Sequence, residues 1–337
     1  MKTTHSLPTL LRGFFEDHLV GQRDVSPNTI MAYRDAFLLF LRFAAKRRNC
    51  QVIRLQLEDL GPATLRAFLN HLETDRRNCV ATRNCRLVAI HRFFAYVASC
   101  EPLYAQLCRR ILDVPVKKAT TYPMTYLDRD EVKAVLAAPH PAHTLGLRDL
   151  ALLTFLYNTG ARVSEAVTLD IADLRLEAPA QVGILGKGRK QRWCPLWAET
   201  AAALREYLHQ RRLTGKPQSP LFVNARGQRL SRHGVNAILQ RHLLTAAKAQ
   251  PSLQKKRIGP HSFRHTAALH LLQAGVELNV IRAWLGHVSI TTTSQYIEID
   301  MTMKREALKR CQPLVSGLGH NSPWRTRQDI IQWLHDM

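Results

Sequence analysis

The stretch from His261 to Tyr296 constrains the fold more than any other part of the chain. It reads HSFRHTAALHLLQAGVELNVIRAWLGHVSITTTSQY and holds four polar groups of unlike chemistry within 36 residues. His261 and Arg264 are three residues apart, so they share one face of a helix. A Trp-Leu-Gly break precedes His287, and Tyr296 follows nine residues later. The pattern predicts one helix face, one glycine turn and one tyrosine that act together.

These residue types have complementary chemistry. The planar fork of an arginine binds phosphate, a histidine transfers protons near neutral pH, and a tyrosine can act as a nucleophile. We interpret the stretch as a phosphate pocket beside a tyrosine, which favours phosphoryl transfer through the tyrosine oxygen. The chain has no P-loop, dinucleotide fingerprint or HExxH motif. We therefore expect side chains to supply the chemistry, without a cofactor or a metal.

Positive charge is spread along the whole chain. Its 337 residues include 48 lysines and arginines against 26 aspartates and glutamates, which gives a formal net charge of +22. When the chain is divided near residue 118, both parts remain positive. This favours a polyanionic partner contacted by the whole molecule, with nucleic acid ahead of a membrane surface. The alternative is a basic protein whose charge serves only solubility.

Cysteine usage and hydropathy indicate a reducing, aqueous compartment. The seven cysteines form no CxxC pair, and their number is odd. No apolar run approaches the ~20 residues of a transmembrane helix, and no signal peptide is apparent. We expect a cytoplasmic, nucleoid-associated protein with no membrane partner. Its thiols are expected to be reduced, with those from Cys50 to Cys108 filling a helical core.

The first part of the chain predicts a bundle of helices. Apolar residues recur at helical intervals in four segments, 7–19, 27–47, 63–75 and 81–98. Ser26 before Pro27 predicts an N-cap followed by proline at the first helical position. A stretch rich in proline, lysine and threonine then predicts an extended linker. The expected order is a helical domain, a linker, a second domain and a tail with a possible docking helix, over residues 1–112, 113–126, 127–312 and 313–337.

Local signals place helix ends in the second domain. Asp128 followed three residues later by Glu131 predicts a capping box. Gly160 closes an apolar helix pattern, and Arg162 lies just after that glycine turn. Glu165 comes one helical turn after Arg162, so we expect it to orient that arginine.

A basic hairpin and several helix faces supply candidates for contact with DNA. Apolar runs flank the GKG of residues 186–188, which predicts a β-hairpin over 181–196 with Lys187 in its turn. Short polar and basic side chains on such surfaces suit phosphates and base edges. The alternative for each of them is a solvated surface. The candidates are Asn28, Thr29, Arg34, Arg83, Asn84, Arg86, Arg189, Lys190, Arg192, Arg232 and Arg241.

Six residues together resemble a known active-site set. They are Arg162, Lys187, His261, Arg264, His287 and Tyr296. The strings TGARVSEAVTL, ILGKGRKQRWCPL, HSFRHTAALHLL and WLGHVSITTTSQY, and the spacings between them, resemble the tyrosine recombinases of the phage-integrase and Xer type. SPNTIMAYRDAFLLFLRF is similar to the first DNA-facing helix of that family's core-binding domain. The resemblance covers residues 7–310. It implies a mostly α fold, with a helical SAM-like core-binding domain and an α-rich catalytic domain that has a small antiparallel β-sheet.

The resemblance also implies a role for each residue. Tyr296 matches the nucleophile that attacks the scissile phosphate and forms a 3′-phosphotyrosyl link. Lys187 matches the hairpin lysine that protonates the departing 5′-oxygen. Arg162 and Arg264 match the pair that clamps the non-bridging oxygens.

Two histidines complete the set, and two others stand outside it. His261 and His287 match the positions that assist proton transfer and hydrogen-bond the phosphate. His265 and His270 match no role in the family, so we expect both to be structural or solvated.

The implied activity is site-specific recombination of double-stranded DNA. It would be carried out by a homo-oligomer, a dimer on each site and a tetramer in the synapse, for a mobile element or for replicon resolution. One alternative is a type IB topoisomerase, which shares the phosphotyrosine chemistry but relaxes any DNA. Another is a DNA-binding regulator that has lost catalysis.

Overall fold

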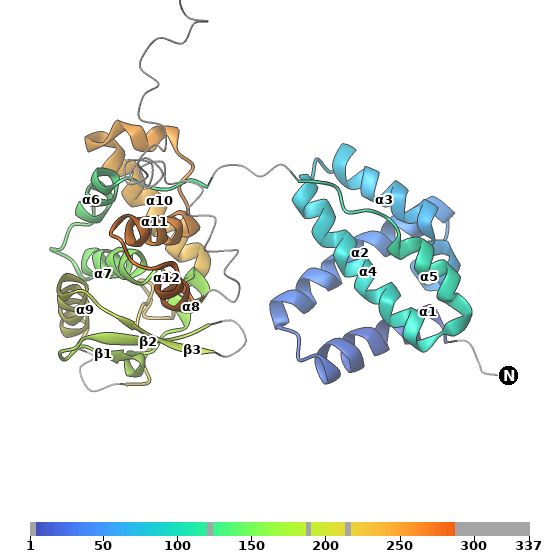
Figure 1. Ribbon diagram of the computed structural model, residues 1–337, viewed down its shortest axis with the longest axis horizontal. Coiled ribbons are helices and arrows are strands. Elements are labelled where there is room, and N and C mark those ends of the chain that lie inside the picture. The colour runs from blue at the N-terminus through green and yellow to red at the C-terminus, as the bar shows by residue number, and fades with distance from the viewer. Residues whose placement is uncertain (1–4, 120–123, 187–189, 213–216, 287–337) are drawn as a thin grey trace, which may run out of the picture. The chain divides into compact units, whose positions relative to one another are not determined.

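The computed structural model describes residues 5–119, 124–186, 190–212 and 217–286, which fall into two compact units (Figure 1). The boundary between the units lies after Tyr122. Helices dominate both, and the strands described form one small antiparallel sheet in the second unit. The predicted mostly α fold with a small sheet is confirmed.

The first unit is a helical bundle. Its elements are α1 (Leu7–Arg12), the π-helical η1 (Gly13–Gln22), α2 (Pro27–Arg48), the short 3-10 turns η2 (Val52–Arg54) and η3 (Leu57–Leu60), α3 (Pro62–Thr74), α4 (Val80–Cys100), η4 (Pro102–Tyr104) and α5 (Ala105–Leu112). The Ser26 hydroxyl accepts a hydrogen bond from the Thr29 amide at 3.4 Å, and Pro27 is the first residue of α2. The predicted start of this helix is confirmed.

Aromatic side chains form the centre of the first unit. The rings of Phe14, Phe37 and Phe93 lie 5.1 to 6.3 Å apart, and all three are buried. Full burial of one such side chain contributes about 1.5–3 kcal/mol, so these contacts hold η1, α2 and α4 together. In α4 the apolar residues Leu87, Ile90, Phe94 and Val97 are buried, which confirms the helical spacing predicted for residues 81–98.

The chain that leaves α5 stays packed on the first unit as far as Lys117. Val114 is buried in the core. The Asn84 side-chain amide donates to the Lys117 carbonyl at 2.7 Å, and its oxygen accepts from the Lys117 amide at 3.2 Å. Residues 114–117, which the sequence assigns to the linker, are therefore attached to α4.

The second unit is also mostly helical. Its elements are α6 (Arg129–Ala137), α7 (Thr144–Thr159), α8 (Val163–Thr168), η5 (Ile171–Asp173), β1 (Leu174–Arg175), β2 (Gln181–Leu185), β3 (Gln191–Pro195), α9 (Ala198–Gln210), α10 (Arg232–Ala249), η7 (Pro251–Lys255), α11 (Pro260–Gln273) and α12 (Leu278–Leu285). The Asp128 carboxylate accepts from the Glu131 amide at 2.8 Å, and the Glu131 carboxylate accepts from the Asp128 amide at 2.9 Å. The predicted capping box is confirmed. Gly160 ends α7 in the left-handed conformation, also as predicted.

The sheet places the basic hairpin next to the helices. Its order is β1-β2-β3 with both pairings antiparallel, and Val182 opposes Cys194 while Ile184 opposes Arg192. Val182, Ile184 and Cys194 point into the main core of the unit. The predicted hairpin is confirmed in its two strands, and the turn residues 187–189 lie outside the described residues.

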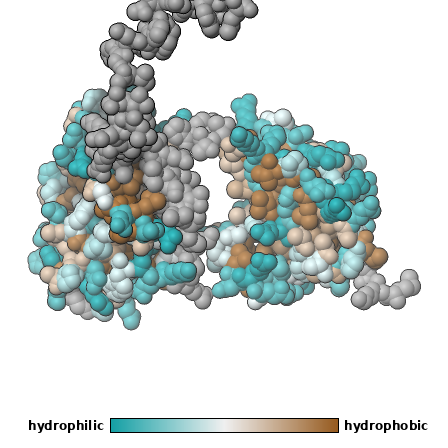
Figure 2. Space-filling model, viewed as in Figure 1, coloured by the Kyte–Doolittle hydropathy of each residue, from teal (hydrophilic) through white to brown (hydrophobic). Residues whose placement is uncertain are grey.

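α11 and α12 form a small core of their own beside an apolar surface. Ala268 and Leu272 of α11 pack against Ile281 and Leu285 of α12. Figure 2 shows hydrophobic residues on the face that carries these two helices. Val280 of α12 is 47% exposed. Within the described ranges, no helix has the length and apolar character that crossing a membrane requires.

The predicted burial of the cysteines is only partly correct. Cys108 is buried, but Cys79, Cys85 and Cys100 are exposed. The apolar face of α4 packs inward. Cys79 precedes the helix, and Cys85 and Cys100 lie on its solvent-facing side.

Candidate active site

The structure describes three of the six residues predicted to form the active site. They are Arg162, His261 and Arg264. Lys187, His287 and Tyr296 lie outside the described residues, as does Arg189 among the DNA-binding candidates. The described residues Gly186 and Gly286 immediately precede two of them in the chain.

Arg264 is fixed in the interior of the second unit. It lies on the second turn of α11 and is 4% exposed. Its Nη1 donates to the carbonyl of Gly160 at 2.7 Å, and its Nη2 donates to the carbonyl of Leu285 at 2.7 Å. One guanidinium therefore joins the end of α7 to the end of α12. A lysine could not hold both carbonyls in this way, because its donors share a single nitrogen.

Gly160 allows α7, α11 and α12 to approach one another closely. A Cβ at this position would lie 2.4 Å from Leu285 Cδ2 and 3.5 Å from the Cβ of Ala267 on α11. The residue also has φ +57°, a conformation that glycine adopts without strain. The chain then turns directly into Arg162, the residue that precedes α8.

Arg162 is held by a carboxylate from its own helix. Its Nη1 donates to Glu165 Oε1 at 2.8 Å, and its backbone amide donates to Glu165 Oε2 at 2.9 Å. The Arg162 side chain is 31% exposed, whereas that of Glu165 is 5% exposed. The predicted orienting role of Glu165 is consistent with this geometry: a buried anchor holds a guanidinium that remains open to an incoming anion.

Glu165 is shared with a second arginine. Arg192 of β3 donates from Nη2 to Glu165 Oε2 at 2.7 Å. Burial by itself would raise the pKa of Glu165, but the hydrogen bond and charge of Arg192, together with the bonds from Arg162, lower the pKa below its usual value. The carboxylate is therefore ionised at neutral pH and serves as the common acceptor for two arginines.

The histidines of α11 fall into two environments. His261 lies in the first turn and is exposed, where the positive end of the helix also favours an anion. His265 is partly buried, and burial followed by the charges of His261 and Arg264 lowers its pKa. The His270 ring is buried with its Nδ1 2.8 Å from the Tyr157 hydroxyl, and burial lowers its pKa too. The expected structural role is confirmed for His270.

Three of the predicted DNA contacts have side chains that bind their own protein in this structure. Arg83 is 5% exposed, donates to the Pro115 carbonyl at 3.2 Å and pairs with Glu73. Asn84 holds the backbone of Lys117, as described above. The Arg192 side chain is 10% exposed. Helical spacing correctly predicts that Arg83 and Asn84 point away from the core that α4 packs on. The segment after α5 covers both side chains.

The other described candidates stand at or near the surface. Five are exposed, namely Asn28, Arg34, Lys190, Arg232 and Arg241. Arg34 pairs with its neighbour Asp35, and Arg241 is 58% exposed while it pairs with Asp149. Thr29 and Arg86 are partly buried and contact Ser26 and Asn78.

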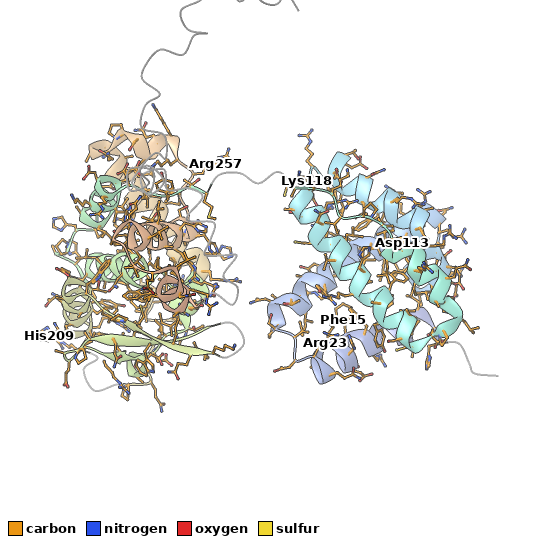
Figure 3. The ribbon with its side chains drawn as sticks, in the orientation of Figure 1. Phe15, Arg23, Asp113, Lys118, His209 and Arg257 are labelled. Atoms are coloured by element: carbon orange, nitrogen blue, oxygen red, sulfur yellow. The ribbon has the colours of Figure 1, made fainter. Side chains whose placement is uncertain are left out.

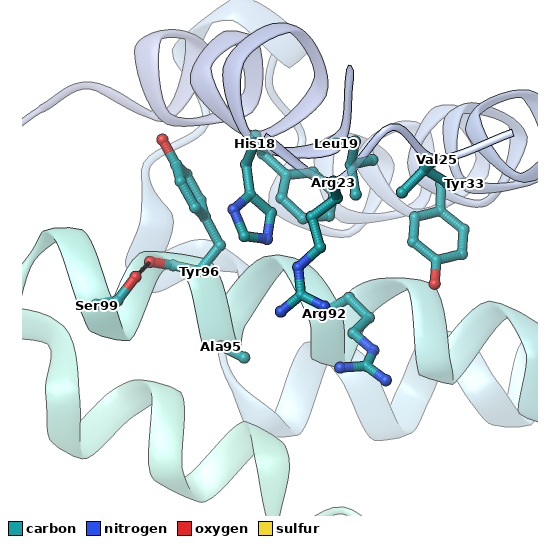
Figure 4. A pocket seen from close by; sticks show the side chains of 10 residues that line it. His18, Leu19, Arg23, Val25, Tyr33, Arg92, Ala95, Tyr96 and Ser99 are labelled. Carbon is teal, nitrogen blue, oxygen red and sulfur yellow. Dashed lines mark hydrogen bonds between the residues drawn. The ribbon is translucent and has the colours of Figure 1, made fainter. Parts of the chain in front are cut away.

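A basic hollow in the first unit escaped the sequence prediction. It has a volume of about 370 Å³ and lies between η1, α2 and α4. Figure 4 shows the Arg23 and Arg92 side chains extending in the same direction across it, with His18, Tyr33 and Tyr96 around them. No ion-pair or hydrogen-bond partner of either guanidinium is found in the described part of the chain. Arg23, which is labelled in Figure 3, is exposed. Nothing in the local sequence links the two, because 69 positions separate them.

Both units of the chain match known protein families. The model of the phage integrase N-terminal SAM-like domain matches residues 14–100, and that of the phage integrase family matches residues 125–303. A putative integrase/recombinase, y4rC of Sinorhizobium fredii (strain NBRC 101917 / NGR234), is 40% identical over 98% of this chain and 98% of its own. The tyrosine recombinase XerC of Pelobacter propionicus is 32% identical over 89% of this chain and 94% of its own.

A solved structure agrees in fold. The XerH site-specific recombinase bound to its palindromic difH substrate superposes with a TM-score of 0.66 at 23% identity, over 88% of this chain and 83% of that one. A helical SAM-like unit, followed by an α-rich unit with a small sheet and two fixed arginines, is the architecture of the tyrosine recombinases. The chain belongs to the phage integrase family.

Proposed function

We propose that this enzyme cleaves and rejoins double-stranded DNA at specific sites through a 3′-phosphotyrosyl intermediate. The observation that carries the proposal is the pair of fixed arginines. Arg264 donates to the Gly160 carbonyl. Arg162 follows Gly160 by two residues, and its guanidinium donates to Glu165. Guanidinium groups held in advance stabilise negative charge that develops on a phosphate during substitution.

Each of the six proposed active-site residues has a role in the reaction. The Tyr296 oxygen attacks the scissile phosphorus, and the bond from phosphorus to the 5′-oxygen breaks. Lys187 gives its proton to that oxygen, while Arg162 and Arg264 bind the non-bridging oxygens of the pentacovalent state. His261 and His287 assist proton transfer, which includes acceptance of the phenolic proton that Tyr296 loses as it attacks. Attack by a 5′-hydroxyl on the phosphotyrosine reverses the step, so the ligation needs no nucleotide cofactor.

The basic hollow of the first unit supports contact with the DNA backbone. The two guanidinium groups have no carboxylate partner among the described residues, so they repel each other, and a phosphate between them would relieve that repulsion. Arg23 and Arg92 therefore replace Arg83 and Asn84 among the proposed DNA contacts, beside Asn28 and Arg34.

Assembly on DNA follows from the same proposal. A palindromic site, such as the difH substrate of XerH, presents two equal half-sites and suits a symmetric dimer. Two such dimers would form the tetrameric synapse. The apolar face beside α11 and α12 supports a contact between copies, because an exposed hydrophobic surface of this kind marks interaction sites. The segment 301–311 or the tail 313–337 is the proposed docking element.

The test is covalent trapping on a nicked suicide duplex. The recognition site is first selected from a randomised duplex library by binding to the full-length protein. Wild-type protein should then form a covalent adduct, whereas Tyr296→Phe should bind the duplex and form none. Persistence of the adduct in Tyr296→Phe would contradict the role of the tyrosine. Relaxation of supercoiled plasmids that lack the selected site would indicate a topoisomerase, and binding without any adduct would indicate a silent regulator.

A further inference from the structure

Arg192 joins three segments that are distant in sequence. It lies on β3, and its side chain is 10% exposed. Its Nη2 donates to Glu165 Oε2 at 2.7 Å, and its Nε donates to the carbonyl of Trp284 on α12 at 2.9 Å. One planar group thus connects the hairpin, α8 and α12, because its donors point in different directions from one rigid plane.

Two glycines border this guanidinium. A Cβ on Gly286 would lie 3.0 Å from Arg192 Nη1 and 3.1 Å from its Cδ. A Cβ on Gly186 would lie 3.3 Å from the same Nη1 and 3.7 Å from Glu165 Oε1. The amide of Gly186 also donates to the Lys190 carbonyl at 2.9 Å, which closes the base of the hairpin turn. Both backbone segments therefore lie directly against Arg192.

These contacts are located where the proposed chemistry needs precise placement. Gly186 is the residue before Lys187, Gly286 is the residue before His287, and Glu165 anchors Arg162. Stability alone does not account for the arrangement, since a buried ion pair adds little over an apolar replacement after desolvation is counted. A fixed geometry of the three segments does account for it.

We propose that Arg192 is a positioning residue for strand cleavage, which sets the base of the hairpin at Gly186, the Arg162–Glu165 pair and the end of α12 in one arrangement. The inference rests on the proposed function, because it assigns Arg192 to that same reaction. Arg192 acts through its neighbours and makes no contact with the reacting phosphate.

A matched control exists in the same unit. Arg229 also pairs with a carboxylate, Asp170, at 2.6 Å, and donates to the carbonyls of Val167 and Leu169 at 3.1 Å each. It thus makes the same kinds of bond as Arg192, without touching Glu165 or the glycines before the proposed catalytic residues. Arg229→Gln reports the loss of an arginine that only supports structure.

The experiment compares full-length wild type, Arg192→Gln, Arg192→Lys and Arg229→Gln on the nicked suicide duplex. Thermal unfolding, the Kd for the duplex, and the single-turnover cleavage rate at saturating protein are measured under one set of conditions. Arg192→Gln should cleave on the order of 10- to 100-fold more slowly, by analogy with the loss of an outer partner that orients a metal ligand. Its Kd should stay within about 3-fold of wild type, a difference below 1 kcal/mol.

The other variants make the outcome decisive. Arg192→Lys should recover part of the rate, because it keeps the charge but cannot span Glu165 and Trp284 together. Arg229→Gln should cleave at the wild-type rate. Equal rate losses in Arg192→Gln and Arg229→Gln, or a wild-type rate in Arg192→Gln, would overturn the inference. Absence of an adduct with wild type would instead overturn the proposed function.

A double-mutant cycle tests whether Arg192 acts through Glu165. Glu165→Gln should slow cleavage, and addition of Arg192→Gln to it should cause little further loss, because residues in one network are not additive. Multiplicative losses would contradict the connection. The cycle uses rate ratios, so it remains valid if each variant is somewhat less stable than wild type.

Discussion

Arg264 of α11 donates to the carbonyl of Gly160 at 2.7 Å, and so fixes the turn from which Arg162 emerges. The two arginines of the proposed site are therefore joined through the backbone of the turn that follows α7. A change at Arg264 should disturb both, because the Gly160 carbonyl loses its donor.

Arg264→Lys should lower the cleavage rate by about 100-fold or more, as is typical when a fixed donor to a developing oxyanion is lost. The lysine keeps the positive charge but cannot hold the carbonyls of Gly160 and Leu285 together. Binding of the duplex should change little, since the charge of the unit is kept. Single-turnover cleavage and a binding titration on the same duplex measure the two effects, and an equal loss in both would show that Arg264 serves mainly affinity.

Gly160→Ala should destabilise the second unit by more than the cost of its backbone conformation. A Cβ there would lie 2.4 Å from Leu285 Cδ2, and overpacking costs about 1–3 kcal/mol. Gly275→Ala is the matched control, because Gly275 also has positive φ but has no atom within 4 Å of an added Cβ. Chemical unfolding of the two variants should differ by at least about 1 kcal/mol. Equal destabilisation would mean that helices α7, α11 and α12 are not tightly packed at Gly160.

The free energy of unfolding should fall as the pH is lowered below about 6.5, the ordinary pKa of histidine. Burial lowers the pKa of His270 in the folded state, so below that pH the unfolded chain binds the proton more readily. The neutral His270 ring contributes its full stability at pH values above the pKa of the unfolded chain. This contribution is lost as the pH falls toward the lower pKa of the folded state. Denaturant unfolding between pH 7.5 and 5.5 measures the slope, and His270→Gln should reduce it. If His270→Gln leaves the pH dependence of the free energy of unfolding unchanged, His270 does not contribute to it.

Replacement of Arg23 and Arg92 by alanine should weaken DNA binding and its dependence on salt. Each phosphate contact contributes about 0.9 to the slope of log K against log salt. The double variant should therefore lose about 0.9 for one shared phosphate. Arg109→Ala with Arg110→Ala on α5 removes the same charge from exposed positions of the same unit. If both double variants lose slope equally, the hollow holds no phosphate and the effect is one of net charge.

Local sequence determined much of the architecture. Ser26 before Pro27, the pair Asp128 and Glu131, and Gly160 each mark a helix end where the structure has one. Caps and turns depend on residues a few positions apart, so the local chain is enough to predict them. The periodicity of apolar residues likewise identified the buried face of α4, because a helix repeats its side-chain directions every 3.6 residues.

By itself the sequence determined the class of fold, the helix ends and the residue types of the proposed site. Only the tertiary structure decided which cations remain free to meet DNA. Arg83 and Arg192 looked like surface cations, yet one is covered by Pro115 and the other is bound to Glu165 and to Trp284, 92 residues away. Arg23 and Arg92, unremarkable in their local sequence, line one hollow. The physical reason is that periodicity fixes where a side chain points on its own helix, whereas its partners come from distant segments that packing brings near.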